Sequence, residues 1–203
     1  MKALLLIDVQ NDFMPGGALA VPNGNEIIPV INKLQEKFDL VIATQDWHPK
    51  SHASFASSYE DSQLFDVIKL NGLDQVLWPD HCIQNTSGAE FHPDLNTKNI
   101  EAIFRKGMNR EIDSYSGFYD NAHLKSTGLT GYLKEKQVDE VYFVGLAAEY
   151  CVYFSIIDSL NEGFKSILIE DGTRALNDKE FQKARIDILR KGGKIIKSEE
   201  LGF

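Results

Sequence analysis

Short apolar runs alternate along most of the chain with longer segments of helical periodicity, and this alternation restricts the fold more than any other feature of the sequence. The runs are continuous rather than alternately polar and apolar, which is the pattern of parallel strands covered on both faces. We expect six strands, at residues 3–7, 40–43, 101–105, 140–145, 166–170 and, more weakly, 194–197.

The segments between these runs place apolar residues every three or four positions, as amphipathic helices do. In the last of them, Asn177 followed by Glu180 resembles a capping box, and Gly192-Gly193 ends the pattern. We expect helices at residues 27–38, 129–136, 149–162 and 178–191. Strands alternating with helices predict a doubly wound, Rossmann-like α/β fold, with a mostly parallel six-stranded sheet, helices on both faces and one domain over residues 1–203.

The segment at about residues 47–99 breaks this alternation. It is polar, it is interrupted by proline and glycine, and it holds four of the five histidines. Short helices are expected within it, for example at residues 59–68. Long connections in compact domains are usually functional or disordered, and the histidines favour a functional insertion that carries a metal and substrate site.

Charge and composition exclude several classes of protein. The chain has 21 basic and 30 acidic side chains and a net charge of −9, which argues against a general nucleic-acid binder. No apolar run approaches the length of a membrane span, and the first run ends too early for a signal peptide. Two cysteines make no disulfide framework, so we expect a cytoplasmic protein; a homo-oligomer is left open.

Three chemically active residues follow different predicted strands and should meet at one edge of the sheet. Asp8 follows the first strand, Lys106 the third, and Cys151 stands in the first turn of the helix after the fourth. A helix N-terminus and an ammonium both lower a thiol pKa, and a carboxylate can accept the thiol proton. The alternatives are a packed cysteine, an acid that forms a turn and a solvated lysine.

A second group combines one carboxylate with two imidazoles. Asp46 and His48 are two apart in an extended segment, so they face the same way, and His81 follows later in the chain. This set suits one divalent metal ion, zinc first, with iron or manganese as alternatives. His52 is a possible fourth ligand or supporting residue. The alternative is that these are loop histidines with surface hydrogen bonds.

Aromatic residues near these groups could line a substrate pocket. Phe13, Trp78 and Tyr115 are the candidates, although an individual aromatic residue is more often part of the core. His92 and His123 have no ligand partner at suitable spacing, and we interpret them as structural.

Several segments, in this order, resemble one family over most of the chain. The first is Leu5-Leu6-Ile7-Asp8-Val9-Gln10-Asn11-Asp12-Phe13, and the next two are Thr44-Gln45-Asp46-Trp47-His48-Pro49 and Trp78-Pro79-Asp80-His81-Cys82. Arg105-Lys106-Gly107 and Asp113-Ser114-Tyr115-Ser116-Gly117-Phe118 follow, and the last segments are Val144-Gly145-Leu146-Ala147 and Cys151-Val152. Together they resemble the nicotinamidase branch of the isochorismatase-like cysteine hydrolases.

The resemblance implies a metal-dependent conversion of nicotinamide to nicotinate and ammonia through a cysteine thioester. It implies that Asp8, Lys106 and Cys151 form the catalytic triad, that Asp46, His48 and His81 bind the metal, and that Phe13 and Trp78 flank a pyridine ring. It further implies an oxyanion hole from the N–H groups of Ala147 and Cys151, and a cis Leu146–Ala147 peptide. Where the family often has Thr-Asp, this chain has Ala148-Glu149.

Other functions stay open at this point. A related hydrolase could act on isochorismate, a carbamoyl amine or a ureido acid, although such members lack the metal set. A zinc hydrolase could attack with metal-bound hydroxide, and a relative could be non-catalytic. A nucleotide-binding module is disfavoured because Gln10-Asn11-Asp12 stands where G-x-G-x-x-G would follow the first strand.

Overall fold

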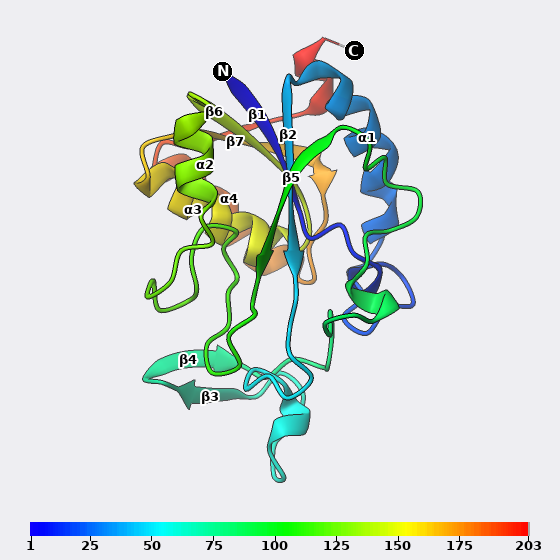
Figure 1. Ribbon diagram of the computed structural model, residues 1–203, viewed down its shortest axis with the longest axis vertical. Coiled ribbons are helices and arrows are strands. Elements are labelled where there is room, and N and C mark those ends of the chain that lie inside the picture. The colour runs from blue at the N-terminus through cyan, green and yellow to red at the C-terminus, as the bar shows by residue number, and fades with distance from the viewer. Residues whose placement is uncertain (203) are drawn as a thin grey trace.

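The computed structural model describes residues 1–202 and is built around a six-stranded parallel sheet (Figure 1). The strand order is β5-β2-β1-β6-β7-β8, and every neighbouring pair is parallel. The strands are β1 Lys2–Ile7, β2 Leu40–Asp46, β5 Ile100–Lys106, β6 Glu140–Gly145, β7 Lys165–Thr173 and β8 Lys194–Ile196. All six lie where the sequence predicts them, and the doubly wound α/β fold is confirmed.

Helices cover both faces of the sheet. In Figure 1, α1 stands on one side of the strands, and α2, α3 and α4 stand on the other. Alternate residues of β1 divide between the two cores: Leu4 and Leu6 pack on the α1 side, and Leu5 and Ile7 pack on the opposite side. The α-helices are α1 Ile27–Leu34, α2 Leu129–Glu135, α3 Tyr153–Asn161 and α4 Asp178–Arg190.

Shorter helical turns link these elements. Asn177 caps α4, since its side chain accepts hydrogen bonds from the backbone N–H groups of Lys179 and Glu180. A π-helical turn, Ala148–Val152, leads into α3, so the helix predicted at residues 149–162 begins as an irregular turn. The 3₁₀ turns are Asn11–Phe13, Gly24–Glu26, Gln35–Lys37, Ala56–Ser58, Ser87–Ala89 and Ser198–Leu201.

The predicted helix at residues 59–68 is wrong. The chain there turns and then forms an antiparallel hairpin of β3 Val67–Leu70 and β4 Leu73–Val76. Both turn residues have positive φ, +50° at Asn71 and +83° at Gly72, which suits the tight turns that match strand twist. The Asn-Gly pair was therefore the available signal for a hairpin.

The sheet reverses its direction of winding between β1 and β6. β1 continues to β2 on one side, whereas β6 begins the half of the sheet that continues to β7 and β8. In open α/β sheets, ligand sites lie beyond the carboxyl ends of the strands at such a reversal. Within the described part of the chain, no helix has both the length and the apolar character that a membrane crossing requires.

Candidate active site

Asp8, Lys106 and Cys151 meet at the carboxyl end of the sheet. The Lys106 ammonium lies 3.0 Å from Asp8 Oδ2 and 3.5 Å from Cys151 Sγ, and it donates to the Ser114 carbonyl at 2.8 Å. Asp8 is fully buried, Lys106 is 2 % exposed and Cys151 is 6 % exposed. The alternative of a solvated lysine is therefore wrong, and Asp8, whose carbonyl accepts from the Gln10 N–H in a turn, also pairs its carboxylate with Lys106.

Burial and charge together set the protonation of this cluster. Burial raises the pKa of Asp8, although the neighbouring Lys106 opposes the shift. Burial alone would lower the pKa of Lys106, but the charges of Asp46 and Asp8 outweigh it and hold the pKa well above its usual value. Burial also raises the pKa of Cys151, and Lys106 again opposes it. These directions favour a neutral thiol and a charged ammonium in this cluster, next to a carboxyl group of increased basicity.

The local backbone directs these side chains toward one another. Asp8 adopts φ +49° directly after β1, and its Oδ1 accepts a hydrogen bond from Thr44 Oγ1 at 2.6 Å. Gly145 ends β6 with φ +115°, and a Cβ there would lie 2.0 Å from the Ile7 carbonyl oxygen. The Leu146–Ala147 peptide, which follows closely, is cis, as the family resemblance predicts. Because glycine permits this close approach, the chain can turn from β6 toward the Cys151 turn.

A carboxylate and two imidazoles converge next to the cysteine. Asp46 Oδ2 lies 3.1 Å from His48 Nε2 and 3.5 Å from His81 Nε2. Each imidazole uses Nδ1 to contact a backbone carbonyl, His48 at Gly107 (3.0 Å) and His81 at Pro79 (2.7 Å). Their burial, 0 % and 3 % exposed, excludes the alternative of surface histidines.

This donor set fits a divalent cation. The side-chain donor atoms of Asp46, His48 and His81 all lie within 4.8 Å of one another. His48 Nε2 is buried and has no hydrogen-bond partner in the described structure. Metal-bound histidines typically use the other ring nitrogen to bond a carbonyl, which leaves Nε2 for the metal. Asp46 Oδ2 lies 3.1 Å from this nitrogen without a hydrogen bond to it, which is an arrangement that suits two ligands of one cation.

Gly107 makes room for this arrangement. It has φ +64°, and a Cβ at this position would lie 2.4 Å from Cε1 of His48. Any other residue would displace the imidazole or strain the backbone. Apart from the glycine after Lys106, no pattern in the sequence indicated this requirement.

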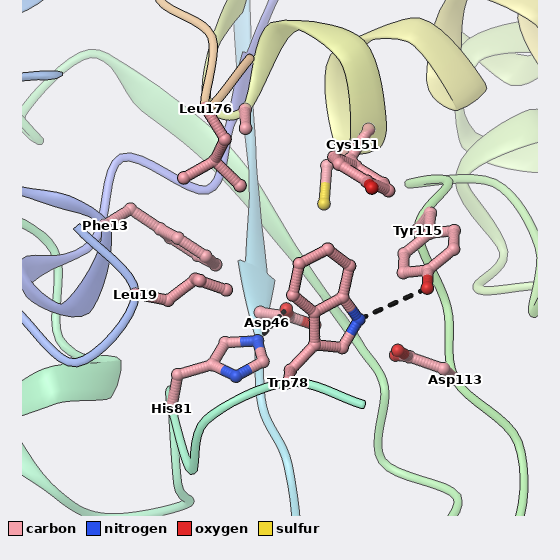
Figure 2. A pocket seen from close by; sticks show the side chains of 11 residues that line it. Phe13, Leu19, Asp46, Trp78, His81, Asp113, Tyr115, Cys151 and Leu176 are labelled. Carbon is pink, nitrogen blue, oxygen red and sulfur yellow. Dashed lines mark hydrogen bonds and ion pairs between the residues drawn. The ribbon is translucent and has the colours of Figure 1, made fainter. Parts of the chain in front are cut away.

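A small pocket joins the cysteine to the carboxylate–imidazole group (Figure 2). In Figure 2, Phe13 and Leu19 form one side and Trp78 and Tyr115 the other. All three predicted aromatic residues line it, together with residues that sequence reasoning did not select. The full lining is Phe13, Leu19, Asp46, Trp78, His81, Asp113, Tyr115, Ala147, Tyr150, Cys151 and Leu176.

The isochorismatase domain model matches residues 2–200 of the chain. A nicotinamidase from Acinetobacter baylyi is 46% identical over 200 residues, which cover 98% of this chain and 94% of that protein. The chain belongs to the isochorismatase family, in its nicotinamidase branch.

Solved structures of this family are similar to the chain over nearly its full length. The Acinetobacter baumanii nicotinamidase/pyrazinamidase has a TM-score of 0.96 and 46% identity, with 98% of this chain and 97% of that chain covered. The pyrazinamidase of Pyrococcus horikoshii in complex with zinc has a TM-score of 0.80 and 36% identity, with 97% and 98% covered.

Glu149 belongs to the Ala148-Glu149 pair that departs from the expected family pattern. Its side chain stabilises the turn before Cys151. Its carboxylate accepts hydrogen bonds from the backbone N–H groups of Asn177 at 2.6 Å and Leu176 at 3.2 Å. The adjacent Ala148 N–H donates to the Arg174 carbonyl at 2.9 Å. Burial raises the pKa of Glu149. Ala148 and Glu149 therefore connect the turn before Cys151, by hydrogen bonds, to the segment that places Leu176 in the pocket wall.

His52 and Asp113 lie just beyond the metal-binding group. His52 Nδ1 lies 2.7 Å from Ser54 Oγ, and its Nε2 is buried without a partner in the described structure. Donor atoms of His48, His52 and Asp113 also lie within 4.8 Å of one another. Asp113 was not selected from the sequence, because its acid follows no strand. His123, in contrast, is 56% exposed and stacks on Tyr119 away from the pocket.

Proposed function

We propose that this protein is an amidohydrolase that converts nicotinamide to nicotinate and ammonia. The observation that carries the proposal is the contact of Lys106 with both Asp8 and the Cys151 sulfur, at a pocket that also holds Asp46 and His81. The nicotinamidase relatives support the choice of substrate. Aromatic side walls suit a planar heteroaromatic ring.

Cys151 is the proposed nucleophile, and Asp8 the proposed base. Asp8 accepts the thiol proton, while the Lys106 ammonium stabilises the thiolate that forms. The thiolate sulfur attacks the carboxamide carbon, and the N–H groups of Ala147 and Cys151 stabilise the oxyanion. Asp8 then returns the proton to the departing nitrogen, which leaves as ammonia while the C–N bond breaks.

Hydrolysis of the resulting thioester completes the cycle. Asp8, ionised again, accepts a proton from water, whose oxygen attacks the thioester carbon. The C–S bond breaks, the Cys151 sulfur regains a proton, and nicotinate is released. Nicotinamide and water are consumed and nicotinate and ammonia are formed, so all atoms balance. Asp8 thus accepts a proton twice and returns it twice, to the departing nitrogen and to the Cys151 sulfur, and its raised pKa suits these transfers.

Asp46, His48 and His81 are the proposed ligands of one divalent cation, zinc first, with iron or manganese as alternatives. The zinc complex of the Pyrococcus horikoshii pyrazinamidase supports zinc. When bound, such a cation supplies a Lewis-acid site for a ring nitrogen of the substrate. Phe13 and Trp78 would hold the ring in its plane, which places the carboxamide next to Cys151.

The decisive experiment measures ammonia and nicotinate release from nicotinamide by the wild type and Cys151→Ala. We expect the variant to lose turnover while its circular dichroism and thermal unfolding stay close to those of the wild type. Cys82→Ala is the matched control, because Cys82 is buried and absent from the pocket lining. Turnover retained by Cys151→Ala would exclude the thiol mechanism and favour attack by metal-bound hydroxide.

A further inference from the structure

Gln75 is a buried polar residue within a largely exposed hairpin. It lies in β4, where Leu73 and Asp74 are exposed, yet its own exposed fraction is only 3 %. A primary amide is costly to bury unless its polar atoms are hydrogen-bonded. Its burial therefore depends on the partners of its side chain.

The partners of Gln75 include the wall of the pocket. The two N–H bonds of its Nε2 are shared among three acceptors, the Tyr115 hydroxyl at 3.0 Å, Asp113 Oδ2 at 3.2 Å and the Val76 carbonyl at 2.8 Å. The Tyr115 hydroxyl also accepts a hydrogen bond from Trp78 Nε1 at 3.2 Å, drawn as a dashed line in Figure 2. The Tyr115 oxygen thus links Gln75 to the indole.

The backbone of Trp78 is fixed independently of this link. Its N–H donates to the Ser54 carbonyl at 2.8 Å, and its carbonyl accepts from the Ala56 N–H at 2.9 Å. The rotation of the indole about its side-chain torsions depends on ring contacts, such as that with Tyr150 at 4.9 Å between centroids, and on the hydrogen bond of its N–H. In Figure 2 the indole stands between Phe13 on one side of the pocket and Tyr115 on the other. A bond from its N–H to a held acceptor restricts that rotation.

We propose that Gln75 is a positioning residue that sets the orientation of the Trp78 indole through the Tyr115 hydroxyl. It thereby fixes the width of the slot between Trp78 and Phe13. The inference rests on the proposed function in one respect, namely that this slot takes a planar heteroaromatic ring. Because Cys151 and its proton partners lie outside this chain of bonds, Gln75 acts on ring binding rather than on the chemical steps.

The kinetic test compares Gln75→Leu with Tyr115→Phe and with the double variant. We expect the KM for nicotinamide to rise about fivefold in each single variant, with kcat changed less than about twofold, because each variant breaks the link to the indole and a fivefold change corresponds to the net contribution of about one hydrogen bond. The double variant should be no worse than either single one, since both changes break the same link. Gln63→Leu is the matched control: it lies in the same insertion, is exposed, and does not line the pocket.

A spectroscopic test reports the indole without any turnover. The chain has two tryptophans, Trp47 and Trp78, so Trp47→Phe leaves Trp78 as the only source of the indole signal. In metal-free protein of that background, Gln75→Leu and Tyr115→Phe should both weaken the near-ultraviolet circular dichroism of the indole and increase its quenching by acrylamide. Gln63→Leu should change neither. Tyr115→Phe removes a single oxygen atom, so it tests the same link even if Gln75→Leu misfolds.

The results separate the two proposals. An unchanged indole signal in Gln75→Leu, additive effects in the double variant, or a fall in kcat at constant KM would overturn the positioning role. If the indole signals change as expected but the wild type does not hydrolyse nicotinamide, the positioning role stands and the proposed function is wrong.

Discussion

Replacing Lys106 by methionine removes one buried positive charge and leaves two carboxylates in place. The ammonium lies 3.0 Å from Asp8 Oδ2 and 3.0 Å from Asp46 Oδ1, and none of the three side chains is more than 5 % exposed. Removal of one partner from a buried ion pair typically costs about 3–5 kcal/mol, because the remaining charge is left uncompensated. Since two carboxylates share this ammonium, we expect a loss of about 4–5 kcal/mol near neutral pH in the metal-free protein.

The loss should diminish as the pH falls. Burial raises the pKa of Asp8 even with Lys106 present, and Lys106 is the main influence that opposes the shift. Without the ammonium, the pKa of Asp8 in the folded state rises further. A carboxyl with a higher pKa in the folded than in the unfolded state binds its proton more tightly when folded. The free energy of unfolding of Lys106→Met therefore falls as the pH rises from the ordinary pKa of Asp8 to its raised pKa. On acidification the variant should regain stability.

Urea unfolding, followed by circular dichroism between about pH 5 and pH 8, measures this effect. Adding Asp8→Asn to Lys106→Met should restore about 2 kcal/mol and flatten the pH dependence, because it removes one stranded charge. Lys179→Met, at an exposed lysine of α4, is the matched control and should stay within about 0.5 kcal/mol of the wild type. A loss of unfolding free energy below about 1 kcal/mol would refute the reasoning, and so would a loss that changes neither with pH nor on addition of Asp8→Asn.

The acid limb of kcat/KM should lie above the ordinary carboxyl pKa, because Asp8 must be ionised and its pKa is raised. No alkaline limb should come from Lys106, because its pKa is held well above its usual value. A pH–rate profile measures both limbs. Zinc at about a hundred times its Kd should stabilise chelator-treated protein by about 2.7 kcal/mol, and His48→Ala should abolish this gain in thermal unfolding. Gly107→Ala should weaken zinc binding measured by calorimetry, because its Cβ would press on the His48 ring. Asn177→Ala should cost about 1 kcal/mol in urea unfolding through loss of the α4 cap, with turnover retained.

The strands and helices could be predicted because their signal is local. Five buried runs and a weaker sixth each lie in one strand of the observed sheet, and the helical periods match the four α-helices. The error at residues 59–68 arose where local signals compete, since apolar residues there suit either a helix or a strand. The Asn71-Gly72 turn decided the outcome by pairing β3 with β4.

The cysteine, lysine and aspartate could be placed near one another because parallel strands end at a common edge. The irregular parts of the site gave no such signal. Gln75 and Asp113 lie in a hairpin and a loop, far apart in sequence, and their contact depends on how these segments fold over the sheet. Tyr150 and Leu176 likewise enter the pocket wall from separate segments.

The order of elements, the parallel sheet and the set of reactive side chains follow from the amino-acid sequence, because hydrophobic periodicity is a property of short segments. Which atoms touch depends on the folded chain as a whole. Contacts of about 3 Å, such as those around Lys106, and the burial that shifts the pKa of Asp8 arise from the packing of many segments at once. No single segment contains that information, since each side chain obtains its neighbours and its exclusion from water from the others.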